Sequence, residues 1–223
     1  MLRELVHFVR HAPRTLVLQQ RLDQGALYDR LCARQDDHGL AAWRAALCGD
    51  LVGDVVEIGA GTGLMFPHYG RDARVTAIEP DDRFAAIAAP RQRAAAAAIT
   101  VTHGTAEALP RAAASCDAAV LGLVLCSVAD PTRALREVRR VVRPGGQVRL
   151  LEHVRSPRRV AGALMRAANP LWRVANRQGC NLDRDPLPAI AAAGLVVERV
   201  EAFQIFTPGL PAFPLRAIWA RRS

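Results

Sequence analysis

The sequence predicts an α/β fold of the doubly wound type, with a mostly parallel sheet of seven strands, an antiparallel edge and helices at the N-terminus. Three observations lead to this prediction. Short apolar runs alternate with helical stretches through the middle of the chain. A glycine-rich turn directly follows the first of these runs. Two further strand-like runs lie near the C-terminus, as in doubly wound sheets that carry an antiparallel edge.

Five apolar runs have the length and composition of buried strands: residues 54–59, 74–80, 99–104, part of 116–127, and 146–154. Helical stretches between them cover roughly residues 63–69, 81–98 and 131–142. An Arg-Pro-Gly-Gly turn at residues 143–146 ends the last of these. Residues 194–203 and 215–223 are predicted as the two strands of the antiparallel edge.

Residues 2–47 have the spacing of helices, with Leu2, Leu5, Val6 and Val9 on one face and basic residues between them. Such a helix lies on a membrane surface, packs on its own domain or covers a site, and we favour the last two over the membrane surface. No apolar stretch reaches 18 residues, and the N-terminus lacks the pattern of a secretory signal. We therefore expect no transmembrane segment and a cytoplasmic location.

The charge of the chain does not favour a nucleic-acid partner. All 30 basic residues are arginines against 21 acidic residues, a formal net charge of +9, but they are scattered along the chain. The five cysteines form no C-x-x-C pair, which fits a reducing compartment. No His/Cys cluster has metal-ligand spacing. We expect neither nucleic acid nor a metal to bind, and the oligomeric state stays open.

The glycine-rich turn reads E-x-G-x-G-x-G, from Glu57 through Gly59 and Gly61 to Gly63. A dinucleotide site reads G-x-G-x-x-G, whereas Leu64 stands at the third glycine position here. The carboxylate of Glu57 would be unfavourable beside a pyrophosphate and favourable beside an ammonium group. The spacing favours a nucleoside with an amino-acid moiety over a nicotinamide dinucleotide, and a tight turn without a ligand is the third alternative.

Two more strand ends carry groups that suit a nucleoside. Glu79, followed by Pro80, ends the second strand, where a carboxylate accepts hydrogen bonds from ribose hydroxyls. Thr105, Ala106 and Glu107 follow the third strand, where an adenine ring would lie. Ligands of such sheets bind outside the carboxyl ends of the strands, so we expect these groups to meet around one ligand.

Five motifs, in order along the chain, resemble those of class I S-adenosylmethionine-dependent methyltransferases, which have a Rossmann-like fold: VVEIGAGTG, AIEPDDRF, HGTAEALP, DAAVLGLVLCSVADP and LREVRRVVRPGGQVRLLEHV. The resemblance begins at about residue 28 and implies S-adenosyl-L-methionine as cofactor. It implies Glu57 and the three glycines at the methionine end, Glu79 and Pro80 at the ribose, residues 105–107 at the adenine, and Leu123 nearby.

LVLCSV, EVRRVVRPGG, LEHV and PLWRVANRQGCNLDRD are similar to one branch, the methyltransferase-like 7 type of alkyl-thiol S-methyltransferases and their bacterial relatives. Quinone C-methyltransferases and phospholipid N-methyltransferases share much of this pattern. The chain shows no internal repeat and no linker, so we expect one methyltransferase domain over residues 1–223, with N-terminal helices at 1–50, a cofactor-binding core at 51–154, and an acceptor cap with the final strands at 155–223.

We expect a small-molecule thiol as acceptor. The alternatives are O-, N- or C-methylation of a small metabolite, quinone or lipid head group. A nicotinamide-dependent oxidoreductase and a non-catalytic cofactor-binding subunit are alternatives of other classes.

The acceptor side carries fewer signals. His153 follows the fifth strand and is the candidate base, because its ordinary pKa suits proton transfer near neutrality; holding the loop is the alternative. Cys126 follows the fourth strand and is interpreted as a pocket wall rather than a nucleophile. Trp172, Cys180 and Asn181 fall in the segment that covers the acceptor pocket in this family. Trp172 either walls that pocket or packs in the core.

Overall fold

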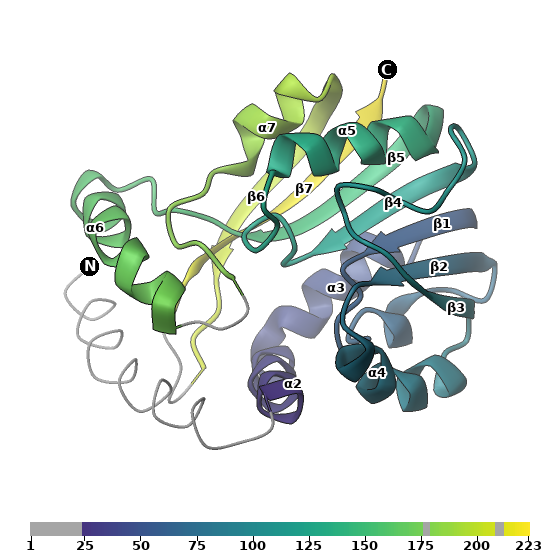
Figure 1. Ribbon diagram of the computed structural model, residues 1–223, viewed down its shortest axis with the longest axis horizontal. Coiled ribbons are helices and arrows are strands. Elements are labelled where there is room, and N and C mark those ends of the chain that lie inside the picture. The colour runs from purple at the N-terminus through teal and green to yellow at the C-terminus, as the bar shows by residue number, and fades with distance from the viewer. Residues whose placement is uncertain (1–23, 176–178, 208–211) are drawn as a thin grey trace.

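The computed structural model describes residues 24–175, 179–207 and 212–223, and a seven-stranded sheet runs through them (Figure 1). The strands are β1 (Gly53–Ile58), β2 (Ala73–Glu79), β3 (Ala98–His103), β4 (Cys116–Gly122), β5 (Val142–His153), β6 (Leu195–Gln204) and β7 (Pro214–Arg222). Their order is β3-β2-β1-β4-β5-β7-β6. Strand β7 is antiparallel to both of its neighbours and the remaining pairs are parallel, which confirms the predicted fold class.

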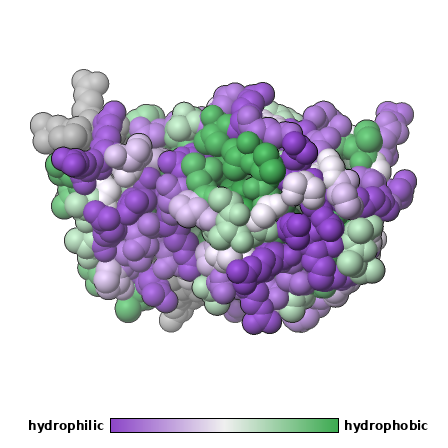
Figure 2. Space-filling model, turned by 90° about the horizontal axis from the view of Figure 1, so that it is seen from above, coloured by the Kyte–Doolittle hydropathy of each residue, from purple (hydrophilic) through white to green (hydrophobic). Residues whose placement is uncertain are grey.

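Helices cover both faces of the sheet, with α5 and α7 on one face and α3 and α4 on the other (Figure 1). The helices are α2 (Gln24–Gln35), α3 (Ala41–Cys48), α4 (Asp82–Ala94), α5 (Pro131–Val141), α6 (Arg159–Ala175) and α7 (Pro186–Ala192), with short helical turns η1 (Asp36–Leu40) and η2 (Phe66–His68). Among the described residues, none of these helices has the length and apolarity to cross a membrane. The face seen from above is mostly hydrophilic, with a hydrophobic patch near its middle (Figure 2).

Helix α5 shows how the sequence specifies these layers. Asp130 caps it by accepting hydrogen bonds from the backbone N–H groups of Thr132 and Arg133, and Pro131 occupies its first turn. Its apolar residues recur at helical spacing, and all of them are buried against the sheet: Ala134, Leu135, Val138 and Val141. Strand β1 is buried on both faces because helices cover both, so apart from Glu57 its buried residues form an apolar run instead of alternating with polar ones.

The strand order reverses between β1 and β4, which lie side by side at the centre of the sheet. The connections from their carboxyl ends depart in opposite directions. Doubly wound sheets bind ligands in the crevice that this reversal creates. The fold therefore brings the loops after β1 and β4 to one site.

Two predicted helix boundaries are wrong. Residues 63–69 form only the 3₁₀ turn Phe66–His68, because Pro67 has no N–H to continue a helical ladder and Tyr69 is extended. The helix predicted over residues 81–98 ends at Ala94. Ala98 pairs with Arg74 in the sheet, so strand pairing overrides the helix propensity of the alanine run.

The Arg-Pro-Gly-Gly turn lies within the first residues of β5 and does not precede that strand. Gly145 has φ +78° there, and the register of β5 against β4 shifts between Cys116 and Ala118. Residues 24–48 are helical as predicted, with a kink at Gly39 (φ +113°). Residues 2–23, and with them the membrane-surface alternative, lie outside the described residues. The division at residues 50 and 154 stays a prediction.

Candidate active site

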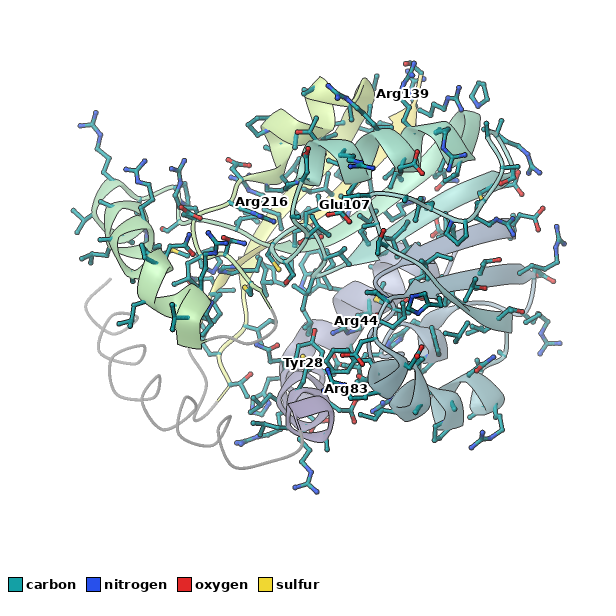
Figure 3. The ribbon with its side chains drawn as sticks, viewed as in Figure 1. Tyr28, Arg44, Arg83, Glu107, Arg139 and Arg216 are labelled. Atoms are coloured by element: carbon teal, nitrogen blue, oxygen red, sulfur yellow. The ribbon has the colours of Figure 1, made fainter. Side chains whose placement is uncertain are left out.

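A cavity of about 660 Å³ opens at the carboxyl ends of the strands. The loops after β1, β2, β3 and β4 and the end of β5 form one side, and α2, α6 and the segment before β7 contribute the other. Figure 3 shows Tyr28 and Arg83 at its lower side and Glu107 at its upper side. The predicted residues that line the cavity are Gly59, Gly61, Glu79, Pro80, Thr105, Ala106, Glu107, Leu123, Cys126, His153, Trp172 and Cys180. Glu57, Gly63 and Asn181 are not part of its lining.

The three glycines of the loop have different tasks, although all have positive φ. A Cβ at Gly61 would meet nothing closer than 4.0 Å, so this position presents bare backbone to the cavity. A Cβ at Gly59 would lie 2.7 Å from Val124, which requires close packing of the loop on the β4 side. A Cβ at Gly63 would lie 2.7 Å from Phe66, so this glycine serves packing behind the loop. Gly61 is the position that allows a ligand to approach.

Glu79 connects the end of β2 to the glycine loop. One carboxylate oxygen accepts a hydrogen bond from the Gly61 N–H at 2.7 Å, and the other accepts one from the Asp81 N–H at 2.9 Å. Burial raises the pKa of Glu79 above its usual value, although both backbone donors act to lower it. Each oxygen keeps a second lone pair, so the carboxylate can still accept hydrogen bonds from ligand hydroxyls.

Glu57 lies beneath the glycine loop. Its side chain shares a face of the sheet with Val55, among Arg44 and Tyr69, and is 1% exposed. Its Oε2 has no hydrogen-bond partner, and burial raises its pKa to about 8. A cation placed beside this carboxyl would lower that pKa and satisfy the orphan oxygen. The direct contact with an ammonium group stays a prediction, because Glu57 is separated from the cavity surface.

The loop after β3 forms the upper side of the cavity. Thr105 forms an isolated bridge with Ala108, which turns the backbone at this point. The Glu107 carboxylate accepts hydrogen bonds from the N–H groups of Ala129 (2.9 Å) and Asp130 (3.3 Å). Glu107 therefore joins this loop to the start of α5 and positions the backbone of residues 105–107 along the cavity.

The loop after β4 has a strained backbone. Leu123 has φ +62°, which a non-glycine residue seldom adopts, and its N–H donates to the Leu151 carbonyl at 2.7 Å. The buried carboxyl of Glu152 accepts hydrogen bonds from the N–H groups of Val124 (3.0 Å) and Leu125 (2.9 Å). Burial raises the pKa of Glu152 well above its usual value. No sequence motif assigns Glu152 a role, and its position beside His153 is the one signal that points to it.

His153 lies at the other end of the cavity, among aromatic and sulfur-containing side chains. Its ring packs edge to face on the Phe213 ring, with the two ring centroids 4.7 Å apart. The centroids of the Phe213 and Trp172 rings lie 5.6 Å apart. Its Nδ1 lies 3.8 Å from the Cys180 Sγ, and its Nε2 is buried without a hydrogen-bond partner. Burial lowers the pKa of His153 below its usual value, so the ring is neutral near pH 7.

Cys126 and Asn181 show how the cap segment joins the loop after β4. The backbone N–H and the side-chain Nδ2 of Asn181 both donate to the Cys126 carbonyl, at 2.8 and 2.9 Å. The Asn181 side chain also donates to the Gly179 carbonyl at 3.0 Å. Asn181 thus holds the two segments together, whereas the cysteines at 126 and 180 face the cavity.

Helix α2 supplies the part of the site for which the sequence showed no motif. Tyr28, Cys32 and Gln35 line the cavity from this helix, and Phe84 lines it from α4. Arg91 of α4 binds both carboxylate oxygens of Asp29 at 2.8 and 3.0 Å and the Thr62 carbonyl at 2.9 Å. These contacts tie α2 to the glycine loop. Throughout the described segments, no group of three or more His, Cys, Asp or Glu side chains could hold a metal ion.

The comparisons agree with this geometry. A family model described as "Methyltransferase domain" matches residues 56–150. The human thiol S-methyltransferase TMT1A is 34% identical over 160 residues, which cover 67% of this chain and 63% of that protein, less than two thirds of its length. The 2-phytyl-1,4-naphtoquinone methyltransferase of Synechococcus elongatus is 30% identical over 178 residues, covering 77% of this chain and 68% of that one.

A geranyl diphosphate C-methyltransferase from Streptomyces coelicolor A3(2) has a similar fold, with a TM-score of 0.61, 15% identity and coverage of 82% of this chain and 81% of that one. The chain belongs to the class I S-adenosylmethionine-dependent methyltransferases. This membership favours the methyltransferase interpretation of the glycine loop over the nicotinamide alternative.

Proposed function

We propose that this protein transfers a methyl group from S-adenosyl-L-methionine to a small thiol. One observation carries the proposal: a single cavity joins the glycine loop and Glu79 to an apolar end that contains His153. When bound, the cofactor supplies an electrophilic methyl group on a sulfonium sulfur. The similarity to the human thiol S-methyltransferase supports a thiol as acceptor.

The residues of the cofactor half fit this ligand. The free lone pairs of Glu79 would accept hydrogen bonds from the ribose hydroxyls, and the open backbone at Gly61 leaves room for the ligand. The orphan oxygen of Glu57 suits an ammonium group nearby. Residues 105–107 would flank the adenine ring. The roles of Pro80 and Leu123 as further contacts belong to the same proposal.

The acceptor half provides orientation, exclusion of water and one proton acceptor. Trp172 and Phe213 form an apolar wall, which suits an uncharged small molecule. His153 is neutral near pH 7, and its unpartnered Nε2 can accept the proton of an entering thiol. A thiol needs only this help, because its ordinary pKa is about 8.5. The free cysteines of the described residues fit the reducing conditions of the cytoplasm, which we propose as the location.

The experiment is a pH comparison of His153→Ala with the wild-type protein on a panel of small thiols, phenols, amines and hydroquinones. Only about 1% of a thiol is ionised at pH 6.5, whereas most of it is ionised at pH 9. We expect kcat with a thiol to fall about 100-fold at pH 6.5 and less than about fivefold at pH 9. The affinity for the cofactor should change little.

Exposed His38 lies outside the cavity lining, and its Nδ1 lies 2.7 Å from the Arg34 carbonyl oxygen on its own helical segment, so it gives the matched control His38→Ala. Equal losses at both pH values for His153→Ala would mean that this residue positions the acceptor without removing its proton. Turnover of hydroquinones, phenols or amines with no thiol methylation would contradict the thiol proposal and retain the methyltransferase class.

A further inference from the structure

Two thiols line the acceptor end of the cavity. Cys126 follows β4 and Cys180 lies in the cap segment, 54 positions later in the numbering yet lining the same cavity. The bond from the Asn181 N–H to the Cys126 carbonyl (2.8 Å) holds the two chain segments side by side. A disulfide needs Cα atoms about 4.4–6.8 Å apart, so its two cysteines must lie on adjacent chain segments, as this backbone bond places them.

The surroundings give the two thiols different reactivity. The neighbouring Cys126 thiol lowers the pKa of Cys180 below its usual value, and the same interaction raises the pKa of Cys126 well above its own. The Cys180 sulfur also lies 3.8 Å from Nδ1 of His153. Cys126 is buried, whereas Cys180 is partly exposed. A thiolate is the nucleophile in thiol–disulfide exchange. Cys180 is therefore the nucleophilic cysteine, and Cys126 is the resolving cysteine that attacks second.

A second observation marks this end of the cavity as a ligand site. His153 is 6% exposed and lines the cavity, and its Nε2 has no hydrogen-bond partner. A buried ring nitrogen without a partner is costly unless a ligand or water satisfies it. The thiol pair therefore lies beside a group that is ready to contact an incoming molecule.

We propose that Cys126 and Cys180 form a reactive dithiol that takes small organic disulfides, and that closing the pair blocks the acceptor end of the cavity. The choice of disulfide rests on the proposed function, because a disulfide of two acceptor thiols would enter where one acceptor thiol does. The reactivity of the pair itself does not depend on methyl transfer.

The reaction proceeds in two exchange steps. The Cys180 thiolate attacks one sulfur of a disulfide RS–SR, the S–S bond breaks, and RS⁻ leaves, giving a mixed disulfide on Cys180. Cys126 then loses its proton to water and attacks the Cys180 sulfur, and the second RS⁻ leaves. The pair is oxidised by two electrons, and one disulfide is reduced to two thiols. The new bond ties the cap to the loop after β4 and removes both thiol groups from the cavity wall.

The test measures protein mass after treatment with 2-hydroxyethyl disulfide, followed by alkylation of the remaining thiols. The wild-type protein should lose two alkylatable thiols without retaining an adduct, and peptide mapping should identify a Cys126–Cys180 bond. Cys126→Ser, or Cys126→Ala if the serine variant is poorly folded, should stop at a stable adduct on Cys180. Cys180→Ser should react at position 126 at least about tenfold more slowly.

Cys32 offers a matched control inside the same cavity. Burial raises the pKa of its thiol to about 11, so peptide mapping of the treated wild-type protein should find Cys32 still reduced. A persistent adduct on wild-type Cys180, or equal modification of Cys180→Ser, would overturn the inference.

Activity separates this inference from the proposed function. Oxidised wild-type protein should lose methyl transfer and recover it after dithiothreitol treatment. If the pair closes but the protein methylates no thiol in either state, the dithiol stands and the proposed acceptor fails. If thiols are methylated and the pair does not close, the dithiol inference fails by itself.

Discussion

Replacing Glu79 with alanine removes a carboxylate that has two functions in the structure. It holds the glycine loop through the N–H groups of Gly61 and Asp81, and its remaining lone pairs face the position proposed for the ribose. Hydrogen bonds to a charged group contribute about 1.5–3 kcal/mol each, but water compensates part of their loss. We expect binding of the cofactor to weaken by about 1–3 kcal/mol, which is a 5- to 150-fold increase in Kd.

Glu79→Gln should give a smaller increase than Glu79→Ala. The amide oxygen can accept one of the two backbone N–H groups, while its NH₂ group faces the other donor. Calorimetric titration with S-adenosylhomocysteine measures Kd, and thermal unfolding separates loss of binding from loss of folding. Glu201→Ala is the control, because this side chain is 40% exposed on β6 and pairs only with Arg199 among the described ion pairs. An unchanged Kd in both folded Glu79 variants would refute the ribose assignment.

Three further predictions address the same half of the site. Gly61→Val should abolish cofactor binding and leave the circular dichroism spectrum largely intact. The φ of +56° and a ligand close to the backbone both exclude a branched side chain at this position. Normal binding by a folded variant would contradict this. Glu57, with a pKa of about 8, should release a proton when a cation binds beside it. The enthalpy of cofactor binding measured by calorimetry at pH 7 should therefore depend on the ionisation enthalpy of the buffer. Glu57→Gln should abolish that dependence. Arg91→Ala should detach α2 from the glycine loop and raise the Kd for the cofactor about tenfold. Residues 24–40 should also be cleaved faster by proteases. Cleavage at the wild-type rate would show that the Arg91–Asp29 pair is dispensable.

The raised pKa of Glu57 also sets the sign of a stability effect. Between the pKa of about 4.5 expected when unfolded and about 8 when folded, the folded state binds more protons. The free energy of unfolding contributed by this group therefore falls as pH rises through that window. Glu57→Gln should unfold at a higher temperature than the wild-type protein at pH 9, and the difference should shrink at pH 5. Equal unfolding temperatures of Glu57→Gln and the wild-type protein at pH 9 would argue against a buried ionised carboxylate.

The strands and the glycine loop could be predicted from the sequence because their signals are local. Each strand is a short apolar run, and the turn after β1 needs positive φ at three positions, which only glycine adopts readily. The position of Glu79 in the cavity lining could be predicted because it ends a strand whose direction follows from the parallel pattern. The boundaries at Phe66–His68 and Ala94 could not, since they depend on sheet pairing and on a proline within a short connection.

The direction of side chains was harder to predict than the position of elements. Val55 and Glu57 share a face because side chains alternate along a strand, but strand β1 is buried on both faces, so its sequence does not reveal whether that face points toward or away from the cavity. The residues that cover the cavity could not be predicted for another reason. Tyr28 and Phe213 come from opposite ends of the chain and meet the strands only through tertiary packing, which no short motif records.

The loop after β4 owes its shape to two residues outside it. The left-handed turn at Leu123 and the two N–H groups that follow are fastened to Leu151 and Glu152 on the neighbouring strand. Loop grafting between related enzymes would therefore fail if only the segment after β4 were transplanted, because the recipient strand must also offer a buried carboxyl at the matching register. Directed evolution toward new acceptors should therefore keep position 152 and the loop after β4 together. The cavity wall around Phe213 can be varied independently of them.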